Sequence, residues 1–375
     1  MIHHSSPRQR STHSTKKTNA SRPCSPHHLT TLKPIIQQLE VIMKGILSAA
    51  FLLIAAATSG VQSAPVTAAA PKPFVIAVLP DTQYYCESYP EIYTSQTQWI
   101  AANAAARNIK FVIHEGDITN LNTAAQWKNA VKSMSYLTGK VPYSLLPGNH
   151  DMGFIASSRD TTLMNKYFPI AAYSAQPTFG GVYEKNKIDN NYHLLTVDGA
   201  EYLLIALEFG PRDAVLNWAG EIIDANPTKR VIISSHAHTY YDNTLQGSKP
   251  SHTGNPESYG IGKTANNGVK VWEKLVRKHS NILMVLNGHM YDGADINSGR
   301  VTGTGDAGNK VYQMLADYQA GPNGGNGFLR LLTFDPAASK ISVETYSPYI
   351  NASKTDDGNK FEYTGVNLMP LVVKQ

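Results

Sequence analysis

Residues 143–151 read Tyr-Ser-Leu-Leu-Pro-Gly-Asn-His-Asp, and this segment is the most specific indication of the fold. A short apolar run, 143–146, is followed by three side chains that can bind a cation or transfer a proton, namely Asn149, His150 and Asp151. A buried strand that ends in polar residues is typical of α/β sheets, in which ligands bind outside the carboxyl ends of the strands. The stretch therefore predicts a strand whose end carries these residues into a site.

Four further apolar runs end in the same manner, in aspartate or histidine. Runs of this length, separated by segments with helical periodicity, indicate buried strands of an α/β fold. Because the carboxyl ends of parallel strands share one edge, we expect the polar residues to meet there. The runs are 74–79 before Asp81, 111–113 before His114 and Gly116-Asp117, 230–233 before Ser235, His236 and His238, and 282–286 before His289.

Taken one at a time, these motifs have ordinary explanations. Aspartate favours turns, so Asp81 or Asp117 alone fits a plain loop. A lone histidine such as His236 or His289 is more often a hydrogen-bonded core residue than a ligand. The motifs together, in this order and each after an apolar run, are hard to obtain by accident, and we interpret them as one site.

The rest of the sequence predicts helices between these strands and an antiparallel region after them. An Asp-Gly turn, 198–199, indicates a hairpin between two alternating segments. Two β-sheets packed face to face with helices outside would bury all the apolar faces. Helices are expected over 94–107, 123–137, 161–167, 213–225 and 271–278, and consecutive antiparallel strands over 311–316, 328–334 and 341–346.

The N-terminal part of the chain has the character of a targeting segment. An apolar stretch, 45–58, follows Met43 and has the length of a secretory core rather than of a membrane span. We expect a signal peptide at 43–64, with an uncleaved anchor as the alternative, and a linker at 65–73. Residues 1–42 are expected to be an untranslated leader or a disordered extension.

The formal net charge of +5 belongs mostly to that N-terminal part. Residues 1–64 hold seven basic residues and one acidic residue, which leaves 26 basic and 27 acidic residues in the remainder. A nearly neutral body gives no sign of a nucleic-acid-binding surface. We expect a secreted or periplasmic monomer with no membrane span in the mature chain.

In motif order, residues 74–350 resemble the calcineurin-like metallophosphoesterase superfamily. The resemblance implies an α/β fold, a four-layer αββα sandwich with two mixed β-sheets, for a domain at 74–350. A C-terminal extension at 351–375 is expected to pack on that domain. The matching stretches are Asp81-Thr82-Gln83, Gly116-Asp117, Gly148-Asn149-His150-Asp151, Ser235-His236 and Gly288-His289.

The resemblance also implies a centre for one or two divalent cations. Asp117 would bridge them, because a carboxylate offers two oxygens and a negative charge that offsets the repulsion between cations. Asp81 would hold the first cation, and Asn149, His236 and His289 would hold the second. Such a mixed nitrogen and oxygen set suits Mn, Zn or Fe.

Two positions depart from the usual pattern, and both concern the first cation. The first motif of the family usually reads Asp-x-His and the last Gly-His-x-His, but Gln83 and Tyr291 stand here where the second histidine of each would be. An amide oxygen binds borderline metals more weakly than imidazole does, and tyrosine ligates only as a phenolate. The chain therefore looks closer to an Asp-x-Gln subgroup, and its first cation is expected to bind weakly, to be a harder metal such as Mn, or to be absent.

The implied activity is hydrolysis of phosphomonoesters or phosphodiesters, nucleotides included, by a water that the metals activate. His150, held by Asp151 or by the backbone, would protonate the leaving group or contact the phosphoryl group. His114, His238 and Arg300 are further candidates for contacts with the substrate or behind the ligands, with a structural role as the alternative for each.

A second class of function stays open at this point. The loss of both histidines at the first cation position would also fit a non-catalytic envelope or extracellular binding protein on a degraded scaffold. Retention of the other six motif residues favours the enzyme.

Overall fold

The computed structural model describes residues 71–372. The expected leader at 1–42, the signal peptide at 43–64 and most of the linker at 65–73 lie outside the described residues. No helix within the described range combines the length and the apolar character needed to cross a membrane.

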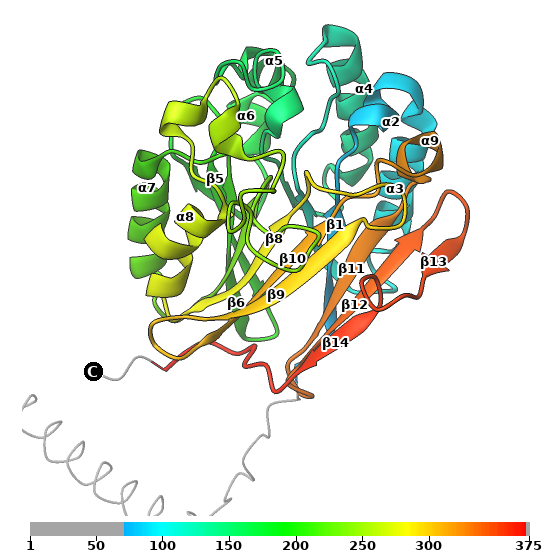
Figure 1. Ribbon diagram of the computed structural model, residues 1–375. Helices are drawn as coiled ribbons and strands as arrows, with labels where there is room; N and C mark the ends of the chain where they lie inside the picture. Colours follow the sequence, from blue (N-terminus) through cyan, green and yellow to red (C-terminus); the bar gives the residue numbers. More distant parts are fainter. Residues whose placement is uncertain (1–70, 373–375) are drawn as a thin grey trace, which may run out of the picture. The chain divides into compact units, whose positions relative to one another are not determined.

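Sheet A contains the first three strands of the chain and four strands from its C-terminal part (Figure 1). In order across the sheet they are β13 (Ala352–Lys354), β12 (Lys340–Ser347), β11 (Leu329–Asp335), β1 (Phe74–Leu79), β2 (Ile109–His114) and β3 (Tyr143–Ser144), with β14 (Phe361–Thr364) also paired to β12. β1, β2 and β3 run parallel, whereas β11 is antiparallel to β1. The sheet is therefore mixed.

Sheet B is built from the middle of the chain. In order across the sheet its strands are β4 (Phe179–Val182), β5 (Asn191–Val197), β6 (Ala200–Leu207), β7 (Arg230–Ser235), β8 (Ile282–Asn287), β10 (Lys310–Ala316) and β9 (Ser298–Thr304). β6, β7, β8 and β10 run parallel, and antiparallel strands flank them on both sides. The predicted hairpin at 198–199 joins β5 to β6.

Helices cover the outer face of each sheet (Figure 1). The side chain of Thr123 accepts a hydrogen bond from the backbone N–H of Gln126 and caps α4 as the sequence predicted. The helices are α2 (Gln83–Ser88), α3 (Pro90–Asn103), α4 (Ala124–Met134), α5 (Thr162–Tyr167), α6 (Ile170–Tyr173), α7 (Asp213–Asp224), α8 (Gly268–Lys274) and α9 (Pro322–Gly325).

The strand β1 shows why the apolar runs are uninterrupted. Phe74, Ile76 and Val78 lie in the core between the two sheets, whereas Val75 and Leu79 lie in the core beneath α3 and α4. Successive side chains of a strand point to opposite faces, so a strand covered on both faces must be apolar throughout. The arrangement confirms the expected four-layer αββα sandwich.

The C-terminal strands differ from the simple antiparallel run that the sequence suggested. β10 joins sheet B, parallel to β8, while β11 and β12 belong to sheet A. β4 and β9 were not predicted, because each is an edge strand whose polar and glycine residues give no apolar run. Beyond residue 350, β13 and β14 extend sheet A, and Val366 and Leu368 enter the core between the sheets.

The predicted strand at 143–146 is shorter in the structure. β3 holds only two residues, because side chains rather than a neighbouring strand bond the next backbone groups: the Leu145 N–H donates to the Tyr173 hydroxyl at 3.0 Å, and Asn191 Nδ2 donates to the Leu145 carbonyl at 2.8 Å. The motif at 148–151 therefore follows a buried irregular segment.

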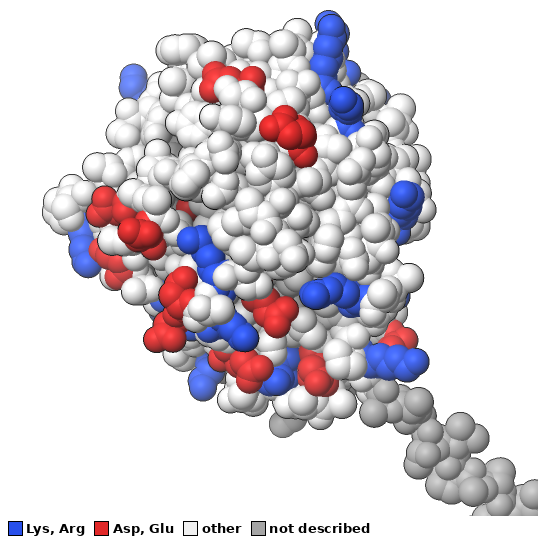
Figure 2. All heavy atoms as spheres, turned by 90° about the vertical axis from the view of Figure 1, so that its right-hand side faces the viewer, with Lys and Arg blue, Asp and Glu red and all other residues white. Residues whose placement is uncertain are grey.

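Charged side chains mix on the face drawn in Figure 2, which is the side with β12 and β13 at the right of Figure 1. Lysine and arginine alternate with aspartate and glutamate there. One such pair joins Lys340 on β12 to Glu362 on β14 at 2.9 Å. This face of the described residues presents no single-sign patch.

A buried histidine outside the strand-end motifs gives a pH-dependent test of this packing. His193 on β5 contacts Thr178 and Tyr173 and is fully buried beside Phe111. Burial lowers its pKa from 6.5 to about 3. The unfolded chain therefore binds the proton more tightly, and the stabilisation that is present above pH 6.5 is lost as the pH falls towards 3.

We expect the difference in free energy of unfolding between the wild type and His193→Gln to shrink by about 2 kcal/mol from pH 7 to pH 5, since only the wild type carries this penalty. Urea denaturation at the two pH values measures it. An unchanged difference would show that His193 is not held neutral.

Candidate metal centre

The loops after five strands bring the predicted residues to one point. His236 Nε2 lies 3.2 Å from Asp117 Oδ2, 3.0 Å from Asn149 Oδ1 and 3.7 Å from Asp81 Oδ1. The backbone N–H of His289 donates to both carboxylate oxygens of Asp81, at 3.3 and 3.2 Å. Residues from 81 to 289 thus share one buried spot.

Three of these residues could ligate one ion without rearrangement. Asp117, His236 and His289 each offer a ligand atom, and the three atoms lie within 4.8 Å of one another. Metal bonds to histidine nitrogen and carboxylate oxygen measure roughly 2.0–2.2 Å. One ion can therefore reach all three atoms.

The loops of the site approach one another so closely that two positions have no room for a side chain. A Cβ at Gly148 would overlap the backbone nitrogen of Asp117, and a Cβ at Gly288 would overlap Oδ2 of Asp81. Asp117 and His289 themselves adopt left-handed conformations, with φ of 46° and 78°. Non-glycine residues in that region cost free energy and cluster at functional sites. The glycines of the motifs are thus required by geometry.

Both histidines have one ring nitrogen fixed by a carbonyl group. His236 Nδ1 lies 2.8 Å from the Glu115 carbonyl oxygen, and His289 Nε2 lies 2.7 Å from that of Gly254. Each N–H donates to its carbonyl, which leaves the other nitrogen free to take up either a proton or a cation. Histidines that bind metals are held in this way. The free Nε2 of His236 then faces three oxygens, an arrangement that a cation between them would satisfy.

The charges of the site point to a missing positive partner. Burial, followed by the charges of Asp317 and Asp117, raises the pKa of Asp81 well above its ordinary range. Burial acts in the same direction on Asp117, but positive charge on His236 and His150 outweighs it and lowers the pKa of Asp117. Among residues 71–372 no lysine or arginine pairs with either carboxylate. The donor set fits a divalent cation.

His150 sits at the accessible side of this cluster. Its backbone N–H donates to Asp117 Oδ1 at 2.9 Å, and its ring Nδ1 lies 2.6 Å from the carbonyl oxygen of Asn120. The residue is half-buried, whereas the adjacent Asn149 is buried. The carbonyl holds Nδ1 and leaves Nε2 available to another partner.

Asp151, predicted to act with His150, contacts other groups. Its oxygens accept hydrogen bonds from the backbone N–H groups of Ile118, Thr119 and Gly148 at 2.8–3.0 Å and from the Thr119 hydroxyl at 2.8 Å. It is fully buried. The carboxylate therefore ties the Asp117 loop to the 148–151 loop, and the backbone, the other option that the sequence left open, holds His150.

His114 has a similar connecting position. Its Nδ1 accepts the backbone N–H of Gly116 at 3.1 Å, and its Nε2 donates to the Thr82 hydroxyl at 3.0 Å. The backbone N–H of Thr82 in turn donates to the Asp117 carbonyl at 3.1 Å. Burial and then the charge of His236 lower the pKa of His114 to about 3, so it is neutral. It holds the two acidic loops together without reaching a substrate.

The proposed roles of His238 and Arg300, in contacting a substrate or supporting the ligands, stay predictions, and the structure gives both side chains other partners. His238 is fully buried and donates from Nε2 to Gln313 Oε1 at 2.6 Å, because its strand-end position turns it into sheet B. Arg300 lies on β9, and its guanidinium stacks over the Phe361 ring at 4.3 Å.

Gln83 and Tyr291, which stand where the family usually has the histidine ligands of the first cation, differ in burial and in ligand chemistry. Gln83 is buried, and its Oε1 has no hydrogen-bond partner among the described residues. Tyr291 is half-buried, and burial, then the charges of Asp317, Tyr84 and Asp81, raises the pKa of its hydroxyl. A phenol that resists ionisation is a poor ligand. Gln83 therefore offers a buried oxygen without a partner, whereas Tyr291 stays a ligand candidate only as a phenolate.

One buried carboxylate near the site was missed from the sequence. Asp317 directly follows β10 and is fully buried, and its charge is the strongest of those that raise the pKa of Asp81. The signal existed, because the run 311–316 ends in aspartate just as the other strands do. It would have been found had β10 been placed beside β8.

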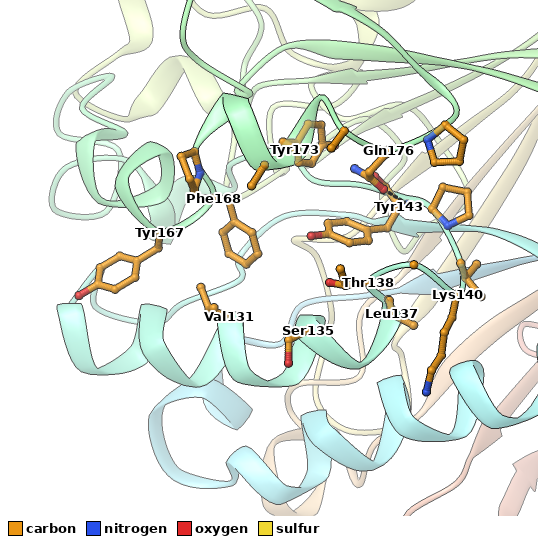
Figure 3. A pocket seen from close by; sticks show the side chains of 17 residues that line it. Val131, Ser135, Leu137, Thr138, Lys140, Tyr143, Tyr167, Phe168, Tyr173 and Gln176 are labelled. Atoms are coloured by element: carbon orange, nitrogen blue, oxygen red, sulfur yellow. Dashed lines mark hydrogen bonds between the residues drawn. The ribbon is translucent and has the colours of Figure 1, made fainter.

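A separate cavity lies away from this chemistry. It has a volume of about 340 Å³ and lies between α4, α6 and the segment around β3 (Figure 3). Val131, Tyr143, Phe168 and Tyr173 contribute its walls, and no carboxylate or histidine lines it. It cannot hold a cation, so the metal centre remains the candidate site.

Comparison with known proteins assigns the family. The model of the calcineurin-like phosphoesterase family matches residues 74–292, more than half of the chain. The chain therefore belongs to the calcineurin-like phosphoesterases, a family of divalent-metal-dependent enzymes. The protein is 36% identical over 303 residues to YvnB, an uncharacterized protein of Bacillus subtilis (strain 168), and the match takes in 78% of this chain but only 22% of YvnB.

One solved structure shows the same fold. Purple acid phosphatase PPD1 from yellow lupin (Lupinus luteus) seeds aligns with a TM-score of 0.50 at 12% identity, over 78% of this chain and 54% of that enzyme. GAP50, the anchor in the inner membrane complex of Plasmodium, aligns with a TM-score of 0.41 at 10% identity, over 79% of this chain and 89% of that protein.

The contacts of Asp151 predict a structural defect on its removal. Asp151→Ala leaves three buried backbone N–H groups without an acceptor, and we expect the free energy of unfolding to fall by about 3 kcal/mol or more. Urea denaturation measures this, with His150→Ala as the neighbouring control of nearly wild-type stability. A stable but inactive Asp151→Ala would instead indicate a chemical role.

Proposed function

We propose that this protein hydrolyses phosphate esters at the centre formed by Asp81, Asp117, Asn149, His236 and His289. The observation that carries the proposal is the convergence of the ligand atoms of Asp117, His236 and His289 within 4.8 Å, with His150 beside them. Family membership supports a metal-dependent phosphoesterase in general. The roles of individual residues and the choice of substrate are the proposal.

The ligand atoms divide between two cation positions. Asn149, His236 and His289 would hold the second cation, Asp81 would hold the first, and Asp117 would bridge them. Mn, Zn or Fe suits the nitrogen-containing position. When bound, the cations would stabilise the negative charge of the phosphoryl group and lower the pKa of a water molecule.

His150 would serve as the acid for the leaving group. The Asn120 carbonyl holds its Nδ1–H, so the imidazolium form of His150 would deliver from Nε2 the proton that a leaving oxygen needs. Its half-buried position lets a substrate approach, whereas His236 and His114 are fully buried. A proton delivered at this atom neutralises the departing alkoxide.

Phosphomonoesters and phosphodiesters, nucleotides among them, are both candidates, because the same centre can bind either. We also propose that the protein acts outside the cytoplasm, on the strength of the apolar segment at 45–58 that follows Met43. Cell fractionation and the N-terminal sequence of the mature chain test this. A cytoplasmic protein with its N-terminus intact would contradict it.

Metal removal tests the function directly. We expect chelation to abolish hydrolysis of p-nitrophenyl phosphate or bis-p-nitrophenyl phosphate, and Mn, Zn or Fe to restore it, because the buried carboxylates need a cation. The preferred ester separates mono- from diesterase activity. Neither bound metal nor hydrolysis under any supplementation would identify a non-catalytic binding protein instead.

Substitutions separate the acid from the ligands. His150→Ala is expected to lower kcat by about 10²- to 10⁴-fold with unchanged metal content, because it removes only proton transfer. Asn149→Ala and His236→Ala are expected to lose metal first. Metal analysis together with steady-state kinetics decides, and a His150→Ala variant that loses metal but keeps its rate per bound ion would contradict the assignment.

A further inference from the structure

The first cation position has an unused oxygen. Gln83 begins α2, two residues after Asp81, and only 3% of its surface is exposed. Its Oε1 is buried and accepts no hydrogen bond from any described residue. A buried amide oxygen without a partner is costly unless a ligand satisfies it. This atom therefore marks a place where a cation would be stabilised.

The other end of the same amide is held by a chain of hydrogen bonds, which we call the amide relay. Gln83 Nε2 donates to Gln319 Oε1. Gln319 Nε2 donates to Asp317 Oδ2 at 2.8 Å, and the Gln319 backbone N–H donates to Asp317 Oδ1 at 3.1 Å. All three side chains are buried.

Asp317 sets the direction of donation along the hydrogen bonds of the amide relay. An ionised carboxylate only accepts hydrogen bonds, so Gln319 must present its NH₂ group to Asp317 and its oxygen to Gln83. Gln83 must then present its NH₂ group to Gln319, which leaves its oxygen on the other side of the amide. Both oxygens of Asp317 accept hydrogen bonds from Gln319, one from its backbone N–H and one from its Nε2, as an ionised carboxylate does.

The fold places the relay at the metal centre. β10 pairs in parallel with β8, with Leu315 opposite Asn287, so Asp317 and His289 follow neighbouring strand ends. The backbone N–H of His289 donates to both oxygens of Asp81, so the loop after β8, next to the strand end that carries Asp317, also holds the first-cation carboxylate. The relay thus lies beside the carboxylates of the first cation position.

We propose that Gln83 Oε1 joins Asp81 and Asp117 to hold the first cation through oxygen alone, and that Asp317 and Gln319 are positioning residues that turn this oxygen towards it. The inference rests on the proposed function and adds residues to it. Because no imidazole contributes, the position should prefer Mn²⁺ to Zn²⁺.

Metal titration tests the relay without reference to activity. The metal-free full chain is loaded with one equivalent of Zn²⁺ at the histidine-containing position and titrated with Mn²⁺, with free Mn²⁺ read by electron paramagnetic resonance. We expect the wild type to bind one Mn²⁺. Asp317→Asn permits both amides to reverse, and it should raise the Kd for Mn²⁺ about 10- to 100-fold while the Zn²⁺ equivalent is retained.

Two further variants distinguish the effect of the hydrogen-bond direction in the relay from the effect of losing a negative charge. Gln319→Met removes the relay without changing the charge and should weaken Mn²⁺ binding to a similar degree. Asp295→Asn removes the same charge as Asp317→Asn from an exposed residue between β8 and β9, and it should bind Mn²⁺ as the wild type does.

A double variant gives a rescue that a purely structural role would not produce. In Asp317→Asn combined with Gln83→Glu, the new amide can donate to Gln319 Oε1 and Gln319 can donate to the new carboxylate, whose second oxygen faces the cation. We expect Mn²⁺ affinity near that of the wild type. Gln83→Glu alone should lack this recovery, since it opposes the existing polarity.

The outcomes are distinguishable. Wild-type Mn²⁺ affinity in Asp317→Asn and Gln319→Met, or no recovery in the double variant, overturns the relay, and so does a wild type that takes up Zn²⁺ but no Mn²⁺. A wild type that binds neither metal overturns the proposed function itself. Thermal unfolding checks each variant, and if Asp317→Asn does not fold, Gln319→Met decides.

Discussion

Two buried carboxylates that have no lysine or arginine partner among the described residues govern the arrangement of the loops around the site. Asp81 and Asp117 lie at the edge where the two sheets meet, and neither pairs with a lysine or arginine of the described residues. Such charges are costly in a protein interior unless a cation or a proton offsets them. The nearby Nε2 of His236 and the backbone N–H groups of His150 and His289 only partly do so.

The neighbouring backbone explains how the two carboxylates stay close. Asp151 gathers N–H groups from two loops, and His114 links the loop after β1 to the loop after β2. Neither side chain is placed to contact a substrate, yet both keep Asp117 where the histidines converge. Residues next to a catalytic motif can therefore be retained for the geometry that they impose rather than for chemistry.

Several features of the fold and the site could be predicted from local sequence. The features that were not predicted depend on contacts between distant segments. The apolar runs and the polar residues after them predicted the strands, their burial and the convergence of Asp117, His236 and His289. The contacts of His238 with Gln313 and of Arg300 with Phe361 could not be predicted, because each joins segments that lie far apart in the sequence. Edge strands β4 and β9 were missed because partners, not composition, define them.

The sequence by itself determined the strand-end motifs, because burial on both faces demands apolar runs and tight loops demand the glycines at 116, 148 and 288. Only the tertiary structure decided that Asp317 and Gln319 belong to the same centre as Gln83. That contact depends on β10 lying parallel to β8, a pairing between distant segments that no local pattern specifies. Long-range strand order therefore settles the ligand environment that local chemistry left open.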